Sequence, residues 1–490
     1  MKDLIELKEK FISSESVKKL SQQVGSETKD HIKLEGLKGA INSFLIASSH
    51  SNNAKNFLII AEEKESAAYL LNNLENIHED NKPLFFPDSF KRPAYFEELN
   101  KTQVLQRTET VNKFTQNEKP KIVVTYPEAL FEKVVAPEIL QENQMSIAKG
   151  EDLDVDSMIY TLNEFGFVQE DFVYEPGQYS IRGGIIDLFS YGNEYPYRLE
   201  LFDDEVESIR FFDPSNQLSV KNIQRITLVP NINTQFNQEQ KVSFLQVLGE
   251  HDVIWLENHQ NFMDRLNACF QKAEEFAEGL SELDDNESAE VFRDRAFILP
   301  SHISADLQLF KIISFGGGNQ QFPHQQSLAF KVKPQPNFNK NFKLLIQDLQ
   351  TNTREGIKNY IFTDNPKQIE RFYSIFADLE ASIDFIPILK SLSEGFVSEE
   401  LGVACYTDHQ IFQRFHRFKL RKGFSKDKAL NLKMLRELKP GDYVTHIDHG
   451  IGQFSGLEKL NINGHTQESV RLFYKNKDVL YVSINALHKI

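Results

Sequence analysis

Residues 440–457 read PGDYVTHIDHGIGQFSGL, a run of turn residues and β-formers that governs the structure of the chain's final segment. Pro440-Gly441-Asp442 is typical of a tight turn, and β-prone residues follow it directly. The glycines of this run supply the backbone freedom that a coiled strand or a bulge requires. Asn463-Gly464 is then a strong hairpin signal. Together these patterns predict a small antiparallel β-barrel of the SH3 or Tudor type over residues 438–490, which binds a partner and carries no catalytic site.

The order of residues in this run resembles the RNA-polymerase-interacting domain of the transcription-repair coupling factor (Mfd) family, which is shared with the CarD family. The resemblance implies that the barrel binds the β subunit of RNA polymerase, with an edge strand and an exposed apolar side chain at the contact. It places Leu460 at that apolar contact and adds His449 and Gly450 to the polymerase-binding residues. The barrel core is expected to contain Ile451, Phe454, Leu472 and Tyr481.

Length and charge limit the number of domains and the kinds of partner that the chain is expected to have. A chain of 490 residues exceeds what one hydrophobic core usually serves, which favours three or four domains. The net charge of −16 opposes general affinity for nucleic acid, because Lys and Arg drive duplex binding. Residues 414–439 are the exception, with ten basic against two acidic residues and a net charge of +8. This run is either a solvated linker helix or a weak contact with DNA.

Cysteine usage and hydropathy indicate a reducing, non-membrane environment. The two cysteines, Cys269 and Cys405, have neither a metal-binding nor a redox spacing. The amino terminus is charged, and no run approaches the roughly 20 apolar residues of a membrane span. His446 and His449 lack accompanying ligands and are expected on opposite faces of a strand, so no metal site is predicted. We expect a cytoplasmic protein without a membrane partner.

The first half of the chain predicts a parallel α/β sheet with an insertion. Apolar runs typical of buried strands lie at residues 56–61, 84–86, 121–125 and 252–256. Helical spacing between such runs indicates a parallel sheet. From residue 171 to residue 229 the pattern changes to short alternating strands, which predicts an inserted antiparallel module. A smaller α/β domain is expected after residues 320–341, whose Gln, Asn and Pro content is typical of a linker.

The predicted chain is therefore a multidomain α/β protein whose first sheet is of a degenerate P-loop type. In order, its parts are a first α/β domain, the inserted module, the return of the first domain, the small α/β domain, the basic linker and the barrel. Their predicted bounds are residues 1–145, 146–232, 233–330, 335–412, 413–437 and 438–490.

The sequence LEGLKGAINS at residues 34–43 lies where a phosphate-binding loop would precede the first helix of the sheet. Such a loop needs Gly-x-x-x-x-Gly-Lys-Ser/Thr, because glycine amides surround the phosphates while the lysine and hydroxyl reach the γ-phosphate and Mg²⁺. Gly36 and Gly39 are present, but the Lys-Ser/Thr ending is not. We interpret the loop as a nucleotide site that has lost its chemistry and expect no cofactor in this chain, with a residual nucleotide contact as the alternative.

A second signature, YEPGQYSIRGGIIDLF at residues 174–189, resembles the UvrB-homology module of the same family. The resemblance implies docking of the repair protein UvrA and places Arg182, Arg198 and Phe202 in that role. Arginines beside an exposed aromatic are also typical of interaction hot spots. Alternatively, the two arginines pair with acids of Asp203-Asp204-Glu205, a cluster that we predict to be a solvated hairpin turn and not a metal or acid–base site.

The resemblance extends over essentially the whole chain and implies an adaptor without catalysis. In the family, an ATP-driven DNA translocase follows the barrel and carries the ATP and Mg²⁺ sites. We interpret the chain as an amino-terminal half that binds RNA polymerase and recruits UvrA to damaged DNA. A UvrB-like ATP-dependent damage-recognition helicase and a CarD-type transcription regulator are the alternatives.

Overall fold

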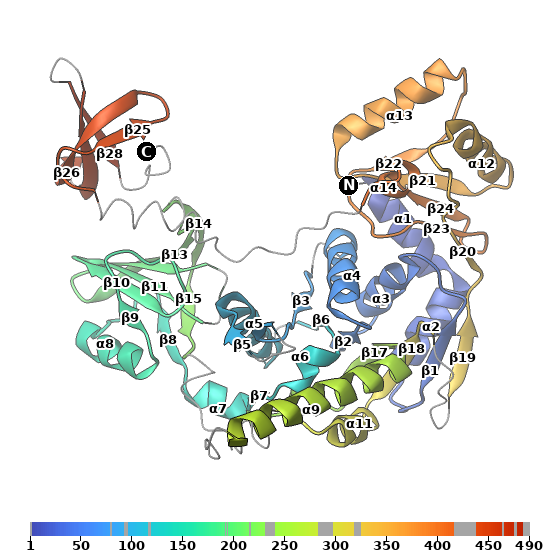
Figure 1. The fold of residues 1–490 in the computed structure, drawn as a ribbon, viewed down its shortest axis with the longest axis horizontal. Coiled ribbons are helices and arrows are strands. Elements are labelled where there is room, and N and C mark those ends of the chain that lie inside the picture. Colours follow the sequence, from blue (N-terminus) through green and yellow to red (C-terminus); the bar gives the residue numbers. More distant parts are fainter. Residues whose placement is uncertain are drawn as a thin grey trace. The chain divides into compact units, whose positions relative to one another are not determined.

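The computed structural model describes residues 2–78, 81–92, 97–115, 119–191, 193, 195–214, 217–230, 241–282, 297–317, 325–415, 438–462, 465–474 and 478–483. They form two compact units (Figure 1). The first unit comprises Met1–Ala136 with Gln238–Leu420, and the second comprises Pro137–Asn237 with Arg421–Ile490.

A seven-stranded parallel sheet organises the first unit, which confirms the predicted parallel sheet. Its order is β19-β1-β18-β17-β2-β6-β3. The strands are β1 (Ile32–Glu35), β2 (Phe57–Ile60), β3 (Leu84–Phe85), β6 (Ile122–Thr125), β17 (Val253–Glu257), β18 (Lys311–Phe315) and β19 (Gln326–Ala329). The central strands are buried on both faces, as expected where helices cover both sides of a parallel sheet.

Helices and short ladders surround this sheet. The helices are α1 (Lys2–Ser13), α2 (Glu15–Gly25), α3 (Ile41–Ser51), α4 (Lys64–Ile77), α5 (Lys101–Thr115), α6 (Pro127–Phe131), α9 (His259–Glu282), α11 (Pro300–Leu307) and the 3₁₀ turn η2 (Phe244–Val247). Strands β4 (Phe90–Arg92) and β5 (Glu97–Leu99) pair with each other, and β7 (Val134–Val135) pairs with β16 (Lys241–Val242). The β7–β16 ladder lies where the chain leaves and re-enters this unit.

A five-stranded sheet of order β20-β23-β24-β21-β22 forms the rest of the first unit. Its elements are β20 (Val332–Pro334), α12 (Phe342–Arg354), β21 (Lys358–Phe362), α13 (Pro366–Asp378), β22 (Ile386–Ile388), β23 (Phe396–Ser398), β24 (Val403–Thr407) and α14 (Asp408–Ile411). The linker predicted over residues 320–341 is wrong, because β19 and β20 lie within it. Both are edge strands, where one-sided burial leaves little apolar signal in the sequence.

The second unit contains the predicted antiparallel module, a six-stranded sheet of order β14-β13-β12-β11-β10-β9. Its strands are β9 (Val168–Gln169), β10 (Gln178–Arg182), β11 (Ile185–Phe189), β12 (Tyr197–Phe202), β13 (Glu205–Phe212) and β14 (Ser219–Ile223). The module also contains α7 (Pro137–Glu142), α8 (Val155–Glu164) and the paired strands β8 (Met145–Ala148) and β15 (Arg225–Leu228). Met158 and Leu162 of α8 pack into the core beneath the sheet.

A four-stranded antiparallel sheet ends the described chain, here called the C-terminal sheet. Its strands, in order, are β25 (Tyr443–His446), β26 (Gly450–Ile462), β27 (His465–Phe473) and β28 (Val479–Ser483). The predicted hairpin residues Asn463-Gly464 lie outside the described residues, between β26 and β27. The bulk of the predicted basic linker, residues 416–437, is likewise outside them.

The core of the C-terminal sheet corrects two predictions. Phe454 and Leu472 are buried as expected, but Ile451 and Tyr481 are 68% and 40% exposed. Ile451 is three positions from Phe454 and Tyr481 is next to buried Val482, and residues at odd spacing on a strand point to opposite faces. Only one residue of each pair therefore enters the core.

Among the described residues, no helix combines the length and the apolar character needed to cross a membrane.

Candidate docking surfaces and the glycine loop

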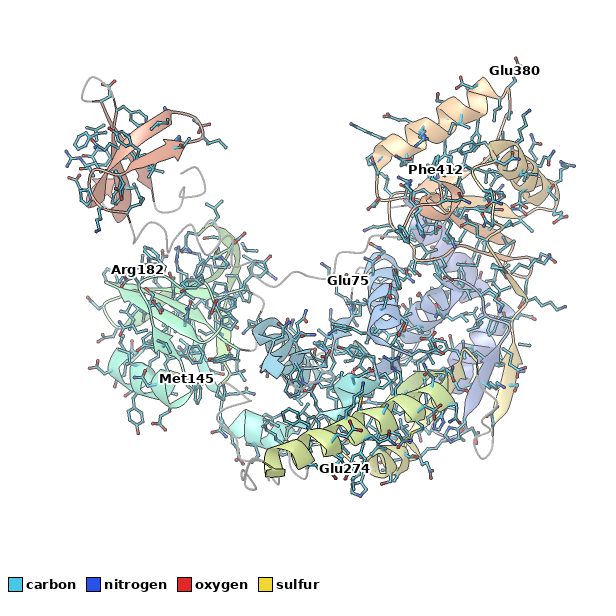
Figure 2. All side chains as sticks on the ribbon, in the orientation of Figure 1. Glu75, Met145, Arg182, Glu274, Glu380 and Phe412 are labelled. Atoms are coloured by element: carbon cyan, nitrogen blue, oxygen red, sulfur yellow. The ribbon has the colours of Figure 1, made fainter. Side chains whose placement is uncertain are left out.

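The register of the six-stranded sheet places its main core on one face and a row of polar residues on the other, beside a smaller buried cluster of Val173, Phe189 and Phe212. Tyr179, Ile186 and Leu199 belong to the core on the side of α8. The alternate positions form a row across the strands, in which Ser180 pairs with Asp187, Asp187 with Arg198, and Arg198 with Arg210. Figure 2 labels Arg182 on the side of the sheet away from α8.

Asp187 anchors both of the predicted docking arginines. Arg198 donates from Nε to Oδ1 of Asp187 at 2.6 Å and from Nη2 to Oδ2 at 2.8 Å. Arg182 donates from Nη2 to the same Oδ2 at 2.5 Å. The sequence thus brings Arg182 and Arg198 together on one carboxylate. The alternative prediction, that the arginines pair with Asp203-Asp204-Glu205, is wrong. Both arginines pair with an acid, but that acid is Asp187 on β11.

The two arginines differ in exposure, and this difference assigns them different roles. Arg198 is buried, stacks over the Phe212 ring at 4.3 Å and donates to Oε1 of Gln217 at 2.7 Å. The side chain of Arg182 is 25% exposed and lies over the Phe172 ring at 4.6 Å. Arg182 is therefore partly exposed at the surface, whereas Arg198 is buried and holds Asp187 in place.

Phe202 is the most exposed member of the predicted trio. It ends β12, pairs with Glu205 across the hairpin, and its side chain is 71% exposed. Asp203 adopts a positive φ of 52°, as tight hairpin turns require, and the chain returns as β13 from Glu205. The predicted solvated turn over these acids is confirmed. Phe202 is a candidate contact for a partner because aromatic rings often dominate protein interfaces.

Sequence reasoning missed Asp187 and Gln217, which orient the arginines. Asp187 is the only acid of β11 and is 1% exposed. A single acid inside an otherwise apolar strand, opposite an arginine, indicates a buried ion pair, because a buried carboxylate needs a partner. That signal was present in the sequence.

In the C-terminal sheet, the predicted polymerase-binding residues lie on β26 and in the turn before it. Leu460 pairs with Gln467 of β27, and its side chain is outside the description. Gly450 has a φ of 72° and faces His446, while His449 is exposed. The ring centroids of His446 and His449 are 4.8 Å apart, so the prediction that the two point to opposite faces is wrong: the turn brings them together.

An apolar surface that was not predicted lies beside these residues. Tyr443, Ile447 and Ile451 are 75%, 76% and 68% exposed on the β25–β26 hairpin. β25 is also an edge strand of its sheet, so its outer backbone groups can pair with a further strand.

The glycine loop after β1 is covered by another part of the first unit. Residues 391–396, here called the covering segment, lie directly over it. The backbone N–H of Ala40, at the start of α3, donates to the Glu394 carbonyl at 3.2 Å. Gly39 has a φ of 58°, and a methyl group on its Cα would lie 2.4 Å from the carbonyl oxygen of Gly395. A helix start that normally offers its amides to an anion contacts a peptide carbonyl here.

Hydrogen bonds from α4 fix the covering segment in place. The amide of Asn73 donates to Oγ of Ser393 at 2.8 Å and accepts from the Ser393 N–H at 2.8 Å. Asn76 donates to the carbonyl of Ser391 at 3.0 Å. Phe396 adds an edge contact with Phe44 of α3, with centroids 5.7 Å apart. The segment is therefore part of the packed structure of this unit.

Carboxylates crowd the same end of the sheet. Burial raises the pKa of Glu257, at the end of β17, to about 7, and the nearby charges of Glu62, Glu394 and Glu63 add to the effect. The Glu62 N–H donates to Oε2 of Glu257 at 3.1 Å. A polyphosphate brought here would meet like charge.

Among the described residues, no group of three or more His, Cys, Asp or Glu side chains is arranged to hold a metal ion. Burial raises the pKa of the Cys269 thiol to about 12 and that of the Cys405 thiol still further. Both are poor nucleophiles near neutral pH.

Two segments match known domain families. Residues 145–233 match the UvrB interaction domain, and residues 438–490 match the CarD-like/TRCF RID domain. These segments contain all the residues predicted to bind UvrA or RNA polymerase.

Curated relatives align with most of this chain at low sequence identity. The transcription-repair-coupling factor of Bacillus subtilis (strain 168) is 22% identical over 526 residues, which cover 93% of this chain and 44% of the relative. The transcription-repair-coupling factor of Staphylococcus aureus (strain bovine RF122 / ET3-1) is 22% identical over 520 residues, with the same coverage of 93% and 44%. The chain thus spans less than half the length of these relatives.

Proposed function

The chain is homologous to the amino-terminal part of transcription-repair-coupling factors, and from this premise we propose that it is a non-catalytic adaptor. In this proposal the C-terminal sheet binds the β subunit of RNA polymerase, and the six-stranded sheet binds UvrA in the cytoplasm. The observation that carries the proposal is that one chain holds both a UvrB interaction domain and a CarD-like/TRCF RID domain.

The geometry of the six-stranded sheet supports the UvrA contact. Arg182 and Phe202 present a cation and a bare aromatic ring, the side chains that most often dominate interfaces. Arg182 donates to Asp187, and Arg198 in turn fixes Asp187 in place. Arg182 is therefore already ordered, and little side-chain entropy is lost on binding. Arg198 then acts as a positioning residue and makes no direct contact.

The covered glycine loop supports a role without nucleotide chemistry. The amide at the start of α3 and the space beside Gly39 are both taken by the covering segment. Binding ATP at this loop would require that segment to leave. We expect isothermal titration with Mg²⁺-ATP to give no heat of binding; saturable binding to the folded chain would support the helicase alternative.

The UvrA contact is tested with a matched pair of exposed aromatics. Phe202 and Tyr160 of α8 are 71% and 69% exposed, but α8 covers the opposite face of the sheet. Phe202→Ala should weaken UvrA binding by about 2 kcal/mol or more, as expected of a hot spot, while Tyr160→Ala leaves it unchanged. Equal affinities of the two variants in a titration calorimeter would contradict the assignment.

The polymerase contact is tested by Leu460→Arg, which should abolish capture of the polymerase β subunit and leave UvrA binding intact. The control is Ile5→Arg, the same change at an apolar residue 50% exposed on α1. Polymerase capture by both variants would contradict the role of Leu460 and would make Tyr443 and Ile451 the next residues to test as the apolar contact. The basic run 414–439 remains a proposed weak DNA contact, which fluorescence anisotropy with a labelled duplex would measure.

A further inference from the structure

Two long stretches of the chain carry no acidic residue, although the chain as a whole has a net charge of −16. Residues 307–347 contain five lysines, and residues 409–426 contain six Lys or Arg side chains. In the five-stranded sheet, β20 and β24 run in the same direction, because each pairs antiparallel with β23. The chain after β20 and the chain after β24 therefore leave the sheet at the same edge, where the two acid-free stretches meet.

A side-chain hydrogen bond joins the two stretches at this edge. Nε2 of Gln413 donates to Oδ1 of Asn339 at 2.7 Å. Both residues have a left-handed backbone, with φ of 52° and 50°, and Lys340 has a φ of 61°. Residues other than glycine rarely adopt this conformation, and it persists where the surrounding structure holds it. The two turns are thus fixed against each other. Residues 339–343 and 413–415, together with Arg371 of α13, are here called the basic corner.

The cations of the basic corner face solvent. Lys340, Lys343, Arg371 and Arg414 are all exposed. The guanidinium carbons of Arg371 and Arg414 lie over the ring of Phe412, which Figure 2 labels, at 4.4 and 5.0 Å from its centroid. That ring is 5% exposed and belongs to the core of the sheet. A buried ring therefore supports both guanidinium groups from one side and leaves them at the surface.

The acidic residues near these cations do not outweigh them. Asp408 accepts from Nη2 of Arg414 at 2.9 Å, but its side chain is 12% exposed while that of Arg414 is 44% exposed. The pair therefore presents mainly its cation to solvent. Asp364 and Glu370 are exposed beside Lys367 at the start of α13. With Lys367 included, five cations stand against three acids, a net charge of +2 in a strongly acidic chain.

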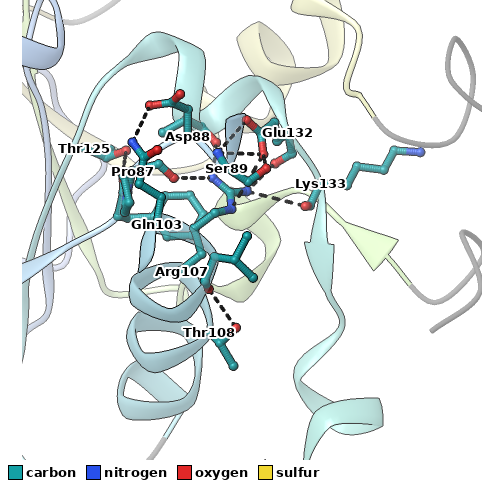
Figure 3. Close-up of polar contacts among 12 residues, drawn as sticks. Pro87, Asp88, Ser89, Gln103, Arg107, Thr108, Thr125, Glu132 and Lys133 are labelled. Atoms are coloured by element: carbon teal, nitrogen blue, oxygen red, sulfur yellow. Dashed lines mark hydrogen bonds and ion pairs between the residues drawn. The ribbon is translucent and has the colours of Figure 1, made fainter. Parts of the chain in front are cut away.

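Two other basic residues of this unit show the opposite arrangement. Arg107 of α5 is 3% exposed and donates to the carbonyls of Pro87 at 2.6 Å and Ala129 at 2.9 Å (Figure 3). Lys311 of β18 is also buried and donates to the Ser26 carbonyl at 2.8 Å. Such cations hold segments of the fold together and cannot meet a partner. The cations of the basic corner are exposed and can.

An exposed aromatic ring follows Arg414 directly. The side chain of Phe415 is 97% exposed. Lys and Arg side chains neutralise phosphates, and aromatic rings stack on the faces of unpaired bases. In a duplex these faces are covered by neighbouring base pairs. A bare ring beside a group of cations therefore favours a single strand over a duplex.

We propose that the basic corner binds single-stranded DNA. Its cations contact successive phosphates, and a base stacks on the ring of Phe415. This inference rests on the DNA contact proposed above for residues 414–439, which begin at this corner, and on the proposed role at damaged DNA. It involves neither UvrA nor polymerase binding, so it can fail while both of those stand.

The first test is fluorescence anisotropy of the full chain with labelled oligodeoxythymidine over a range of salt concentrations. Each phosphate contact adds about 0.7 to the steepness of log affinity against log salt for a single strand. Lys340→Gln/Lys343→Gln should therefore lower this steepness by about 1.4. The control is Lys18→Gln/Lys19→Gln, which makes the same change of net charge at two exposed lysines of α2. Unaltered steepness in the first variant, with circular dichroism showing an intact fold, would overturn the proposal.

The second test concerns the stacked base. Phe415→Ala should weaken binding by about fivefold or more and leave the salt dependence unchanged, because it removes a ring and no charge. The control is Tyr160→Ala, which removes a ring that is 69% exposed on α8. The duplex made by annealing oligodeoxyadenosine should bind more weakly than the single strand. Unchanged affinity of Phe415→Ala, or tighter binding of the duplex or of oligouridine, would contradict the assignment to single-stranded DNA.

A third variant separates this inference from the contact on which it rests. Arg421→Gln/Lys422→Gln alters two residues of the run 414–439 that lie outside the described residues. We expect this variant and Lys340→Gln/Lys343→Gln both to weaken binding of oligodeoxythymidine. If only Arg421→Gln/Lys422→Gln does so, the run binds DNA and the basic corner does not. If the unaltered chain binds no DNA, both proposals fail.

Discussion

The glycine loop after β1 and the hairpin after β12 are both tight turns with positive φ, yet the rest of the chain treats them in opposite ways. Gly39 lies against the covering segment, whereas Phe202 projects into solvent. The loop is closed by contacts within its own unit, and the hairpin is left open. The comparison shows that a sequence pattern indicates a kind of turn, while only the packing around it decides whether a ligand can reach it.

The largest expected effect comes from breaking the closed turn. Gly39→Val places a branched side chain at a φ of 58° against the carbonyl of Gly395 and should lower the free energy of unfolding by about 4 kcal/mol. Gly183→Val is the control in the open region, because its φ is 60° and a methyl group there would meet nothing within 4 Å. It should cost only backbone strain, about 1–2 kcal/mol. Equal losses in urea denaturation would show that the covering segment is not packed as described.

The next effect separates the two arginines beside the open turn. Arg198→Ala removes two hydrogen bonds from the buried Asp187 carboxylate and should cost about 3 kcal/mol of stability. Arg182→Ala removes one bond at a partly exposed position and should cost about 1 kcal/mol. Thermal unfolding of both variants measures the difference. A larger loss for Arg182→Ala would reverse the roles that we assign to them.

A pH-dependent effect distinguishes the closed region. The pKa of Glu257 is raised from 4.5 to about 7 in the folded state, so the folded protein holds a proton that the unfolded chain has released between these values. Stability therefore falls as pH rises from about 4.5 to about 7. Glu257→Gln should remove this fall and gain about 2 kcal/mol above pH 7. A Glu257→Gln variant whose stability still falls between these pH values would refute the buried charge.

The smallest expected effect is on the stability of the open turn itself. Phe202→Ala should change the free energy of unfolding by less than about 0.5 kcal/mol, because the ring is 71% exposed and packs little. Chemical denaturation measures this change. A loss above about 2 kcal/mol would mean that Phe202 is a core residue, and its effect on UvrA binding could then arise from unfolding.

The sequence predicted the features that depend on local pattern. Buried runs such as residues 121–125 indicated the parallel sheet, and the alternation after residue 171 indicated the inserted antiparallel module. The sequence did not predict edge strands such as β19, because their burial is one-sided. It also placed Ile451 in the core, whereas the alternation of the strand turns this residue to the exposed face. A residue's apolar character does not say which face of a sheet it joins.

For the candidate sites, too, the sequence predicted what depends on local pattern and missed what depends on tertiary packing. The residue types around Arg182 and Phe202 were visible in the sequence, and so was the missing lysine of the glycine loop. The covering of that loop was not, because it depends on contacts between Gly39 and Gly395, which are more than 350 residues apart.

The short ladder between β7 and β16 has a consequence for how this architecture can change. Val134 pairs with Val242 and Val135 with Lys241, so the chain leaves the first unit and returns to it at adjacent points. Closing the chain there with a tight turn would delete the whole inserted segment while leaving every strand of the seven-stranded sheet in place. The ladder is therefore a point at which an inserted module can be gained, exchanged or lost without changing the sheet of the first unit.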